Sequence, residues 1–249
     1  MIVREDGVFF GLIRQHDHGL LSGEIAARWG NEHFSSPGHS MIIAASLHDL
    51  SWIEADEQIL WDEAAERPHD FVSLPNEHRL PMYEKGLQLT EQLNPFGGLL
   101  VSKHYCSFLN DNENAETDRF LQNERNRQQR LTERFSESAL DRDLLQLQCW
   151  DNLSLYVCMH RPGCSKDEEI DWFKNGIRCP KKSGEDVWIN VKWLNERTIS
   201  LDPFPFQESW STTVPYTRMR KSLGRNDPDL RNIMHRRIRF SPNDAGGGC

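Results

Sequence analysis

Residues 40–50 read SMIIAASLHDL, and this stretch decides the fold that we expect. It is apolar on nearly every side of a helix, which is typical of a helix buried on all sides at the centre of a helical bundle. His48 and Asp49, two ionisable residues, lie at the inner end of this predicted helix. The stretch therefore predicts both a buried central helix and a polar group inside the bundle.

Two further predicted helices carry an ionisable residue on an apolar face. In residues 11–29, His18 lies on the same side of the helix as Ile25, in a series of positions spaced by three or four residues. In residues 140–158, Asp151 occupies a core position in a stripe of leucines with the same spacing. The spacing predicts that both side chains point into the bundle.

A fourth ionisable residue comes from the middle of the chain. Pro81 predicts the start of a helix over residues 81–94, and a further helix is expected over residues 99–109, where His104 shares its face with apolar side chains. Residues 112–135 are so rich in charge and glutamine that we expect an exposed helical arm. His104 is thus a further candidate for the inside of the bundle.

The pattern changes after the Arg-Pro-Gly-Cys break at residues 161–164. Apolar and polar residues alternate over residues 187–193 and predict a strand, which a turn joins to a second strand over residues 197–201; the proline-containing segments that follow predict edge strands. We therefore expect a mainly α protein, a helical bundle with a small C-terminal antiparallel β extension. Residues 1–160 would form the helical metal-binding body, and residues 161–249 the β-containing extension packed on it.

Composition narrows the function classes. The chain has 249 residues, 37% of them hydrophobic, and a formal net charge of −9. No apolar stretch approaches the roughly 20 residues that cross a bilayer, and the N-terminal residues lack a signal-peptide pattern, so we expect a cytoplasmic protein with no membrane partner. The acidic body argues against nucleic-acid binding. The basic C-terminal segment, residues 213–240, either meets phosphate, RNA or an acidic partner or lies across the protein's own acidic surface.

The six cysteines show no metal-binding C-x-x-C pair. Cys164 and Cys179 enclose a short loop and could form a disulfide in an oxidising compartment. Cys149 and Cys158 lie in apolar contexts typical of reduced core residues. We therefore expect no structural disulfide, and we expect the last residues, Gly246–Cys249, to be disordered.

Chemistry is expected where the buried ionisable residues meet. An unpaired carboxylate inside a helical core costs several kcal/mol, so Asp49 and Asp151 need cations or strong donors. One metal ion would satisfy these carboxylates together with His18 and His48. Neutral imidazoles and ionised carboxylates suit a divalent metal ion such as Fe, Mn, Zn or Ni. The sequence therefore predicts a metal site in the bundle.

The arrangement resembles the HD-domain superfamily of metal-dependent phosphohydrolases, whose signature is a histidine, an adjacent His-Asp pair and a distant aspartate on successive helices. Here these residues are His18, His48, Asp49 and Asp151. The resemblance to a bacterial family of HD-like proteins whose reaction is not known is carried by QHDHGLLSG (15–23), HDLSWIEAD (48–56) and WDNLSL (150–155). It implies an HD-like helical fold and a divalent metal ion. It also implies that His104 could bind a second ion.

Each ligand also has a purely structural interpretation. His18 could be a core histidine bonded to a backbone carbonyl, and His104 an ordinary core or surface histidine. His48 and Asp49 could form a cap or a salt bridge. Asp151 could pair with an arginine, either Arg14 or Arg161 of the same chain. These alternatives stay open at the level of sequence.

Other residues are weaker candidates for the same site. Lys103 and Arg14 could hold a phosphate or carboxylate of the substrate, and Trp52 could line the pocket. Asp56 could accept a hydrogen bond from the ring nitrogen of a histidine that binds the metal through its other nitrogen. The Ser22-Gly23 pair indicates close approach of two helices rather than a nucleophile.

The function that we expect is a metal-dependent hydrolase, a phosphohydrolase acting on a small phosphorylated metabolite or nucleotide through a bound water of lowered pKa. No catalytic residue beyond this water is expected. The substrate would be a small, anionic molecule, and a homodimer is left open as an alternative to a monomer. Two other classes of function are weighed, a di-iron oxygenase of HD-like type and a non-catalytic ligand sensor or interaction module.

Overall fold

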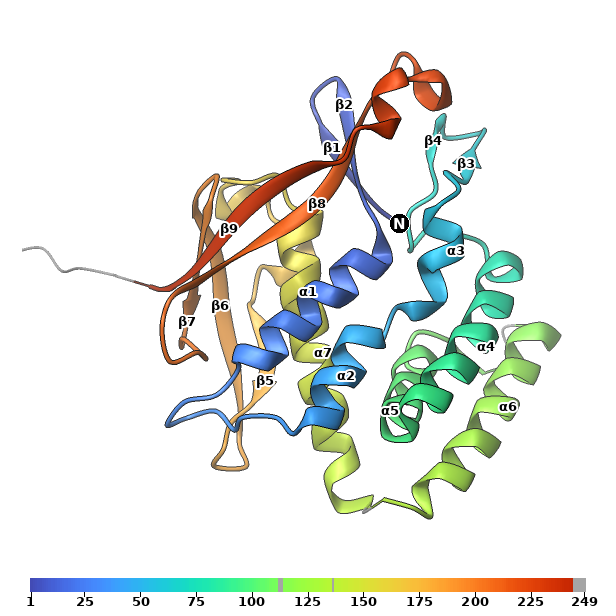
Figure 1. The fold of residues 1–249 in the computed structure, drawn as a ribbon, viewed down its shortest axis with the longest axis vertical. Coiled ribbons are helices and arrows are strands. Elements are labelled where there is room, and N and C mark those ends of the chain that lie inside the picture. Colours follow the sequence, from blue (N-terminus) through green and yellow to red (C-terminus); the bar gives the residue numbers. More distant parts are fainter. Residues whose placement is uncertain (112–113, 136, 244–249) are drawn as a thin grey trace, which may run out of the picture.

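The structure is a computed structural model that describes residues 1–111, 114–135 and 137–243. The expected disorder of residues 246–249 lies outside these described residues. Helices and a curled sheet lie side by side, with α1 and α7 next to the sheet and the remaining large helices beyond them (Figure 1). The helices are α1 (Gln15–Arg28), α2 (His39–Leu47), α3 (Ile53–Asp56), α4 (Asn76–Leu93), α5 (Pro95–Cys106), α6 (Ala115–Thr132) and α7 (Glu137–Met159).

The strands form one large sheet and one small hairpin. They are β1 (Ile2–Asp6), β2 (Phe9–Ile13), β3 (Trp61–Asp62), β4 (Arg67–Pro68), β5 (Ile177–Pro180), β6 (Asp186–Asn195), β7 (Thr198–Asp202), β8 (Trp210–Arg220) and β9 (Met234–Pro242). The seven-stranded sheet has the order β1-β2-β8-β9-β7-β6-β5. β7 and β9 are parallel and the other neighbours antiparallel, so the sheet is mixed.

The prediction of a mainly α bundle with a small antiparallel β extension is wrong. The sheet is large and mixed, and it begins with β1 and β2, which precede the first helix and pair with β8. The alternation that would reveal β1 is hidden in the sequence because Arg4, a charged residue, is buried next to Ile2 on the inward face of the strand. A sheet assembled from strands about 200 residues apart leaves no local signal of its size.

The predicted central helix corresponds to α2, which contacts α1, α5 and α7. Its inward side chains include Ala44 and Ala45, whose small size lets the neighbouring helices approach closely. α2 ends at Leu47, so His48 is its C-terminal cap and Asp49 begins the turn into a short 3-10 helix, η1 (Leu50–Trp52). The polar pair therefore lies in a helix-to-helix corner.

Two helical predictions need correction in detail. Pro81 does not open a helix, because α4 begins at Asn76 and contains this proline in its interior. The predicted exposed arm is α6, and it is amphipathic: Phe120 and Leu121 are buried against α4 and α5 while its charged side faces outward. The predicted strand pair is confirmed, since β6 and β7 form an antiparallel hairpin in which Asn195 pairs with Thr198.

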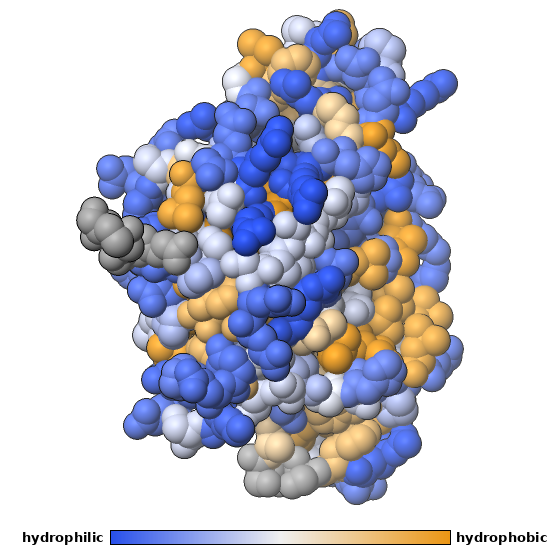
Figure 2. Space-filling model, turned by 60° about the vertical axis from the view of Figure 1, so that its left-hand side comes forward, coloured by the Kyte–Doolittle hydropathy of each residue, from blue (hydrophilic) through white to orange (hydrophobic). Residues whose placement is uncertain are grey.

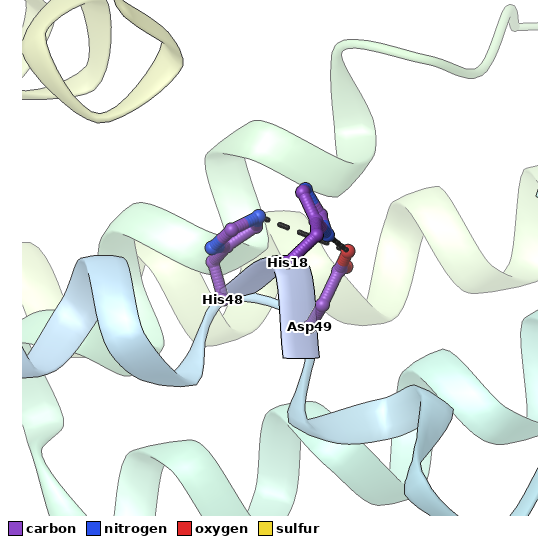
Figure 3. Close-up of side chains that lie close together, drawn as sticks. All are labelled: His18, His48 and Asp49. Carbon is purple, nitrogen blue, oxygen red and sulfur yellow. Dashed lines mark ion pairs between the residues drawn. The ribbon is translucent and has the colours of Figure 1, made fainter. Parts of the chain in front are cut away.

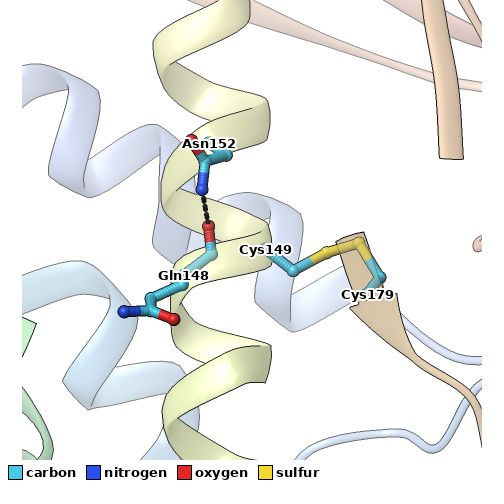
Figure 4. The surroundings of a disulfide bond; sticks show 4 residues. All are labelled: Gln148, Cys149, Asn152 and Cys179. Atoms are coloured by element: carbon cyan, nitrogen blue, oxygen red, sulfur yellow. Dashed lines mark hydrogen bonds between the residues drawn. A yellow bond between two sulfur atoms is a disulfide. The ribbon is translucent and has the colours of Figure 1, made fainter. Parts of the chain in front are cut away.

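The expectation of no structural disulfide is also wrong. Cys149 on α7 and Cys179 on β5 are joined, with their Cα atoms 5.3 Å apart (Figure 4). Cys158 and Cys164 are free. The apolar context of Cys149 indicated its burial correctly, but the packing of β5 against α7, which supplies its partner, is not visible in the sequence.

The basic C-terminal segment, residues 213–240, forms most of β8 and β9 and the turn between them. Several of its cations meet the protein's own carboxylates: Lys221 pairs with Glu5, and Arg225 with Glu63. The face seen in Figure 2 is mostly hydrophilic, with separate hydrophobic patches. Within the described residues, no helix is long and apolar enough to cross a membrane.

The close contact of α1 with α2 gives a test of the packing. A Cβ atom on Gly23 would lie 1.9 Å from Ser46 Oγ and 2.8 Å from Ser46 Cβ, whereas one on Gly19, a turn earlier, would lie no closer than 3.5 Å to any neighbour. We expect Gly23→Ala to lower the free energy of unfolding by about 1–3 kcal/mol through overpacking. Gly19→Ala should leave it unchanged or raise it by up to about 1 kcal/mol. Urea denaturation measures both, and equal stabilities would contradict this helix contact.

Candidate metal centre

Five buried ionisable side chains meet between the helices. His18 comes from α1, His48 and Asp49 from the corner after α2, His104 from α5 and Asp151 from α7. Their exposed fractions lie between 0% and 6%. The structure thus brings together all five residues predicted as ligands, from segments as far apart as residues 18 and 151.

The three imidazoles surround one carboxylate. His18 Nε2 lies 2.9 Å and His48 Nε2 3.2 Å from Asp151 Oδ1, and His104 Nε2 lies 3.3 Å from Asp151 Oδ2. The second carboxylate, Asp49, approaches the same rings: its Oδ2 atom is 3.3 Å from His18 Nδ1 and 3.7 Å from His48 Nε2 (Figure 3). The cluster therefore contains three imidazoles and two carboxylates with no lysine or arginine in these contacts.

Backbone carbonyls orient two of the rings. His18 Nδ1 lies 2.7 Å from the carbonyl oxygen of Gln15, and His48 Nδ1 lies 2.7 Å from that of Ala45. A carbonyl oxygen can only accept, so each Nδ1 carries a hydrogen and donates it. In a neutral ring the Nε2 atom then carries no hydrogen, and its lone pair faces a carboxylate oxygen. Such an arrangement of acceptors requires a cation between them, either a proton or a metal ion.

Metal-free, the cluster holds protons. Burial opposes charge on His48, but the carboxylates of Asp49 and Asp151 outweigh it and raise the pKa of His48 to about 9. Burial likewise opposes charge on Asp151, but hydrogen bonds from His104, His18 and His48 hold the pKa of Asp151 well below its usual range. Asp151 is therefore a carboxylate, and without a metal ion an imidazolium compensates it.

A tyrosine that sequence reasoning missed holds the corner of the site. The Tyr105 hydroxyl lies 2.6 Å from the carbonyl oxygen of His48, 3.3 Å from Asp49 Oδ1 and 2.6 Å from Ser51 Oγ. These bonds fix the backbone between the two ligands. Tyr105 follows His104 directly on α5, and adjacent helical residues point about 100° apart, so periodicity gave no sign that both serve one site.

The structural alternatives can be compared with these contacts. His18 does bond to a backbone carbonyl, but only through Nδ1, and its other nitrogen faces Asp151. Asp151 has neither of the arginine partners considered: Arg14 is exposed and Arg161 pairs with Glu168. His104 is buried, and within the described residues its Nδ1 atom has no hydrogen-bond partner.

A cavity of about 770 Å³ opens from the cluster, and Asp49, His104 and Asp151 reach its wall. Trp52 lines it as predicted, but Lys103 and Arg14 are not among its lining residues, and Lys103 lies 3.7 Å from Asp141 instead. Sequence reasoning missed other lining residues, including Arg79, Tyr83, Trp172 and Trp188.

The structure does not bring Asp56 to the histidines. Its Oδ2 atom accepts a hydrogen bond from the backbone N–H of His16 at 3.0 Å, and its Oδ1 atom lies 3.0 Å from the amino group of Met1. Asp56 therefore ties the start of β1 to the start of α1.

Residues 1–221 match a protein family described as "Protein of unknown function (DUF3891)". The chain belongs to this family. All five residues of the cluster lie within the matched DUF3891 region, which ends just after β8. No curated protein and no solved structure matches the chain. The DUF3891 match itself makes no link to the HD-domain superfamily.

The raised pKa of His48 predicts how the metal-free protein responds to pH. Its folded-state pKa of about 9 lies above the ordinary 6.5, so its contribution to stability is complete below pH 6.5 and is lost as pH rises toward 9. With a chelator present, we expect the free energy of unfolding to fall over this interval by up to about 1.4 kcal/mol per pH unit for one proton, and the thermal midpoint to fall with it.

Thermal unfolding at half-unit pH steps measures this response. His48→Gln should remove most of the slope, while His78→Gln, at an exposed histidine, should keep it. Stability that rises between pH 6.5 and 9 in the metal-free protein would contradict the assignment.

Proposed function

We propose that the protein is a metal-dependent hydrolase that cleaves a phosphoester in a small, anionic molecule. One observation carries the proposal: the Nε2 atoms of His18, His48 and His104 surround the carboxylate of Asp151 inside the helical core. If the cluster held only protons, it would contribute little to stability, because a buried network of charges rarely stabilises a fold more than hydrophobic side chains of the same volume. Metal binding gives the cluster a use.

The donor set fits a divalent metal ion. Two overlapping groups, His18-His48-Asp49 and His48-His104-Asp151, each place one ligand atom per residue within 4.8 Å of the others. Mixed imidazole and carboxylate donors suit Fe, Mn, Zn or Ni and disfavour the harder Ca²⁺. The carbonyl bonds at His18 Nδ1 and His48 Nδ1 are the usual support of ligating histidines, because they fix the ring and its tautomer.

A bound ion would supply Lewis-acid chemistry, lowering the pKa of a water molecule and offsetting charge on phosphoryl oxygens. The protein's own residues would set the conditions for this step. Asp49 and Asp151 provide the negative charge that holds the cation. Tyr105 keeps Asp49 in place through its hydroxyl. Trp52 and Tyr83, both buried side chains on the cavity wall, limit the water that reaches the site.

The order His18, His48-Asp49, Asp151 on successive helical segments also supports a relation to the HD-domain phosphohydrolases, and we include that relation in the proposal. A cytoplasmic location remains a prediction, and the Cys149–Cys179 disulfide counts against it, because disulfides form mainly in oxidising compartments. Five possible ligands, one more than a tetrahedral ion needs, favour one second candidate, a site for two iron ions that activates oxygen. His48 would bind only one of these ions, because its Nδ1 atom donates to the carbonyl oxygen of Ala45.

Metal analysis tests the site directly. We expect wild-type protein to carry close to one or two equivalents of metal per chain after metal-replete expression, and His48→Ala and Asp49→Ala each to retain less than about a tenth of that content, because each removes a ligand shared by the cluster. Elemental analysis by mass spectrometry measures the content. His78→Ala removes an exposed histidine and serves as the matched control.

Metal that stays bound in both ligand variants would contradict the assignment. The loaded wild type should hydrolyse compounds in a panel of phosphomonoesters and phosphodiesters, releasing phosphate from a monoester or an alcohol and a monoester from a diester. Both variants should lose this activity together with the metal. Iron-dependent oxygen consumption without hydrolysis of any ester in the panel would replace the hydrolase by the oxygenase. A loaded protein that shows neither reaction would favour a ligand sensor.

A further inference from the structure

The cavity ends in an unusually apolar mouth. Four large hydrophobic side chains line the cavity and are still exposed to solvent, at 52% for Val72, 53% for Phe108, 56% for Trp172 and 58% for Trp188. The remaining tryptophans are buried or half-buried. Exposed apolar side chains gathered around an opening are typical of a binding site, because leaving them in water has no benefit for the fold.

Backbone geometry holds the two tryptophans in place. Trp188 on β6 pairs with Arg178 on β5, so both side chains lie on the same face of this strand pair, and both residues line the cavity. Trp172 lies in a short 3-10 helix, η3 (Asp171–Phe173), that leads into β5. Gly176 between them has a φ of 87°, and a Cβ atom there would lie 2.7 Å from the carbonyl oxygen of Ile189. The segment that carries Trp172 is thereby packed closely against β6.

The opposite wall supplies a cation. Arg79 on α4 donates to the side-chain oxygen of Asn76 and to the carbonyl oxygen of Phe71, the latter at 3.3 Å, and it lines the cavity. Within the described residues it forms no ion pair with a carboxylate. Arg178 differs, because Asp186 accepts a hydrogen bond from its Nε atom at 2.8 Å. Arg79 is therefore the cation on this wall whose charge is left for a ligand.

The apolar mouth of the cavity and the histidine cluster are in direct contact. Phe108 at the mouth packs edge-on against His104, with ring centroids 4.6 Å apart, so the apolar rim reaches the histidine cluster. The volume of about 770 Å³ lies within the range that encloses a small organic molecule. A ligand that filled it would meet His104, Asp49 and Asp151 at one end, a guanidinium on one side and indole rings at the mouth.

We infer that the ligand of this cavity is a phosphate ester with a planar aromatic group, and that Trp172 and Trp188 select it. Indole faces bind flat rings by stacking, and Arg79 would bind an oxyanion of the ligand. The phosphoester would lie toward the histidine cluster. This inference deepens the proposed function and rests on it for the position of the reacting group.

Binding of phosphonates tests the inference without turnover, because their carbon–phosphorus bond resists hydrolysis. Calorimetric titration of the metal-loaded protein compares 1-naphthylphosphonate, octylphosphonate and methylphosphonate. We expect the naphthyl compound to bind at least about tenfold more tightly than either of the others, the gain of about 1.4 kcal/mol that an aromatic stack supplies.

Variants assign the selectivity to residues. Trp172→Ala combined with Trp188→Ala should bring the three affinities within about threefold of one another, and Trp188→Phe should keep the preference. Arg79→Gln should weaken all three ligands about equally. Leu194→Ala, an exposed apolar residue elsewhere on β6, and Lys85→Gln, a cation on α4 paired with Glu54, are matched controls and should change none of the affinities.

Equal affinities for the three phosphonates in loaded wild-type protein would overturn the inference and leave the metal site intact. A preference for the octyl compound would overturn it in favour of an aliphatic or lipid ligand. A wild-type protein that binds no metal under metal-replete conditions would instead overturn the proposed function. Elemental analysis of the same samples distinguishes these two results.

Discussion

The structure depends on one buried polar junction, the Asp151 carboxylate surrounded by three imidazoles. A carboxylate removed from water costs several kcal/mol unless cations or strong donors surround it, so each histidine must be in position before the junction is favourable. These residues come from α1, the corner after α2, α5 and α7. Apolar packing alone would let such helices repack with little penalty, but directional contacts to one carboxylate fix how the four segments meet.

The burial of His18 and Asp151 could be predicted from the sequence, because each is a polar residue that interrupts a stripe of apolar residues on a helix. His18 and Asp151 each occupy such a position, and both are buried as the spacing indicated. The partners could not be predicted in the same way. That His48 Nδ1 bonds to its own helix while Nε2 faces Asp151 depends on where α2 ends, and helix ends are the least certain feature of a sequence pattern.

The sheet and the cavity mouth depended on information that the sequence spreads over long distances. Pro215 indicated an edge segment, yet β8 is central: its residues 210–216 pair with β9, while β2 pairs only beyond residue 216, so this proline opposes no second strand. Arg79 lies in the first turn of α4, before Pro81, where the predicted helix was expected to begin. Trp188 lines the cavity because β5, the partner strand of β6, packs against α7, and alternation within one strand cannot reveal this packing.

The metal-ligand residues and the two mouth tryptophans come from different parts of the chain, and a disulfide joins these parts. All five residues of the cluster lie before residue 160, on helices or in the corner after α2, whereas both mouth tryptophans lie after residue 160. Cys149 precedes Asp151 by two residues on α7, and its disulfide partner Cys179 is adjacent to Arg178, the residue that pairs with Trp188 (Figure 4). The disulfide therefore links the strand pair at the mouth to the helix that carries the central carboxylate. Movement of the β5–β6 strand pair away from the histidine cluster would have to carry α7 with it, so the disulfide limits how far Trp188 can move from Asp151.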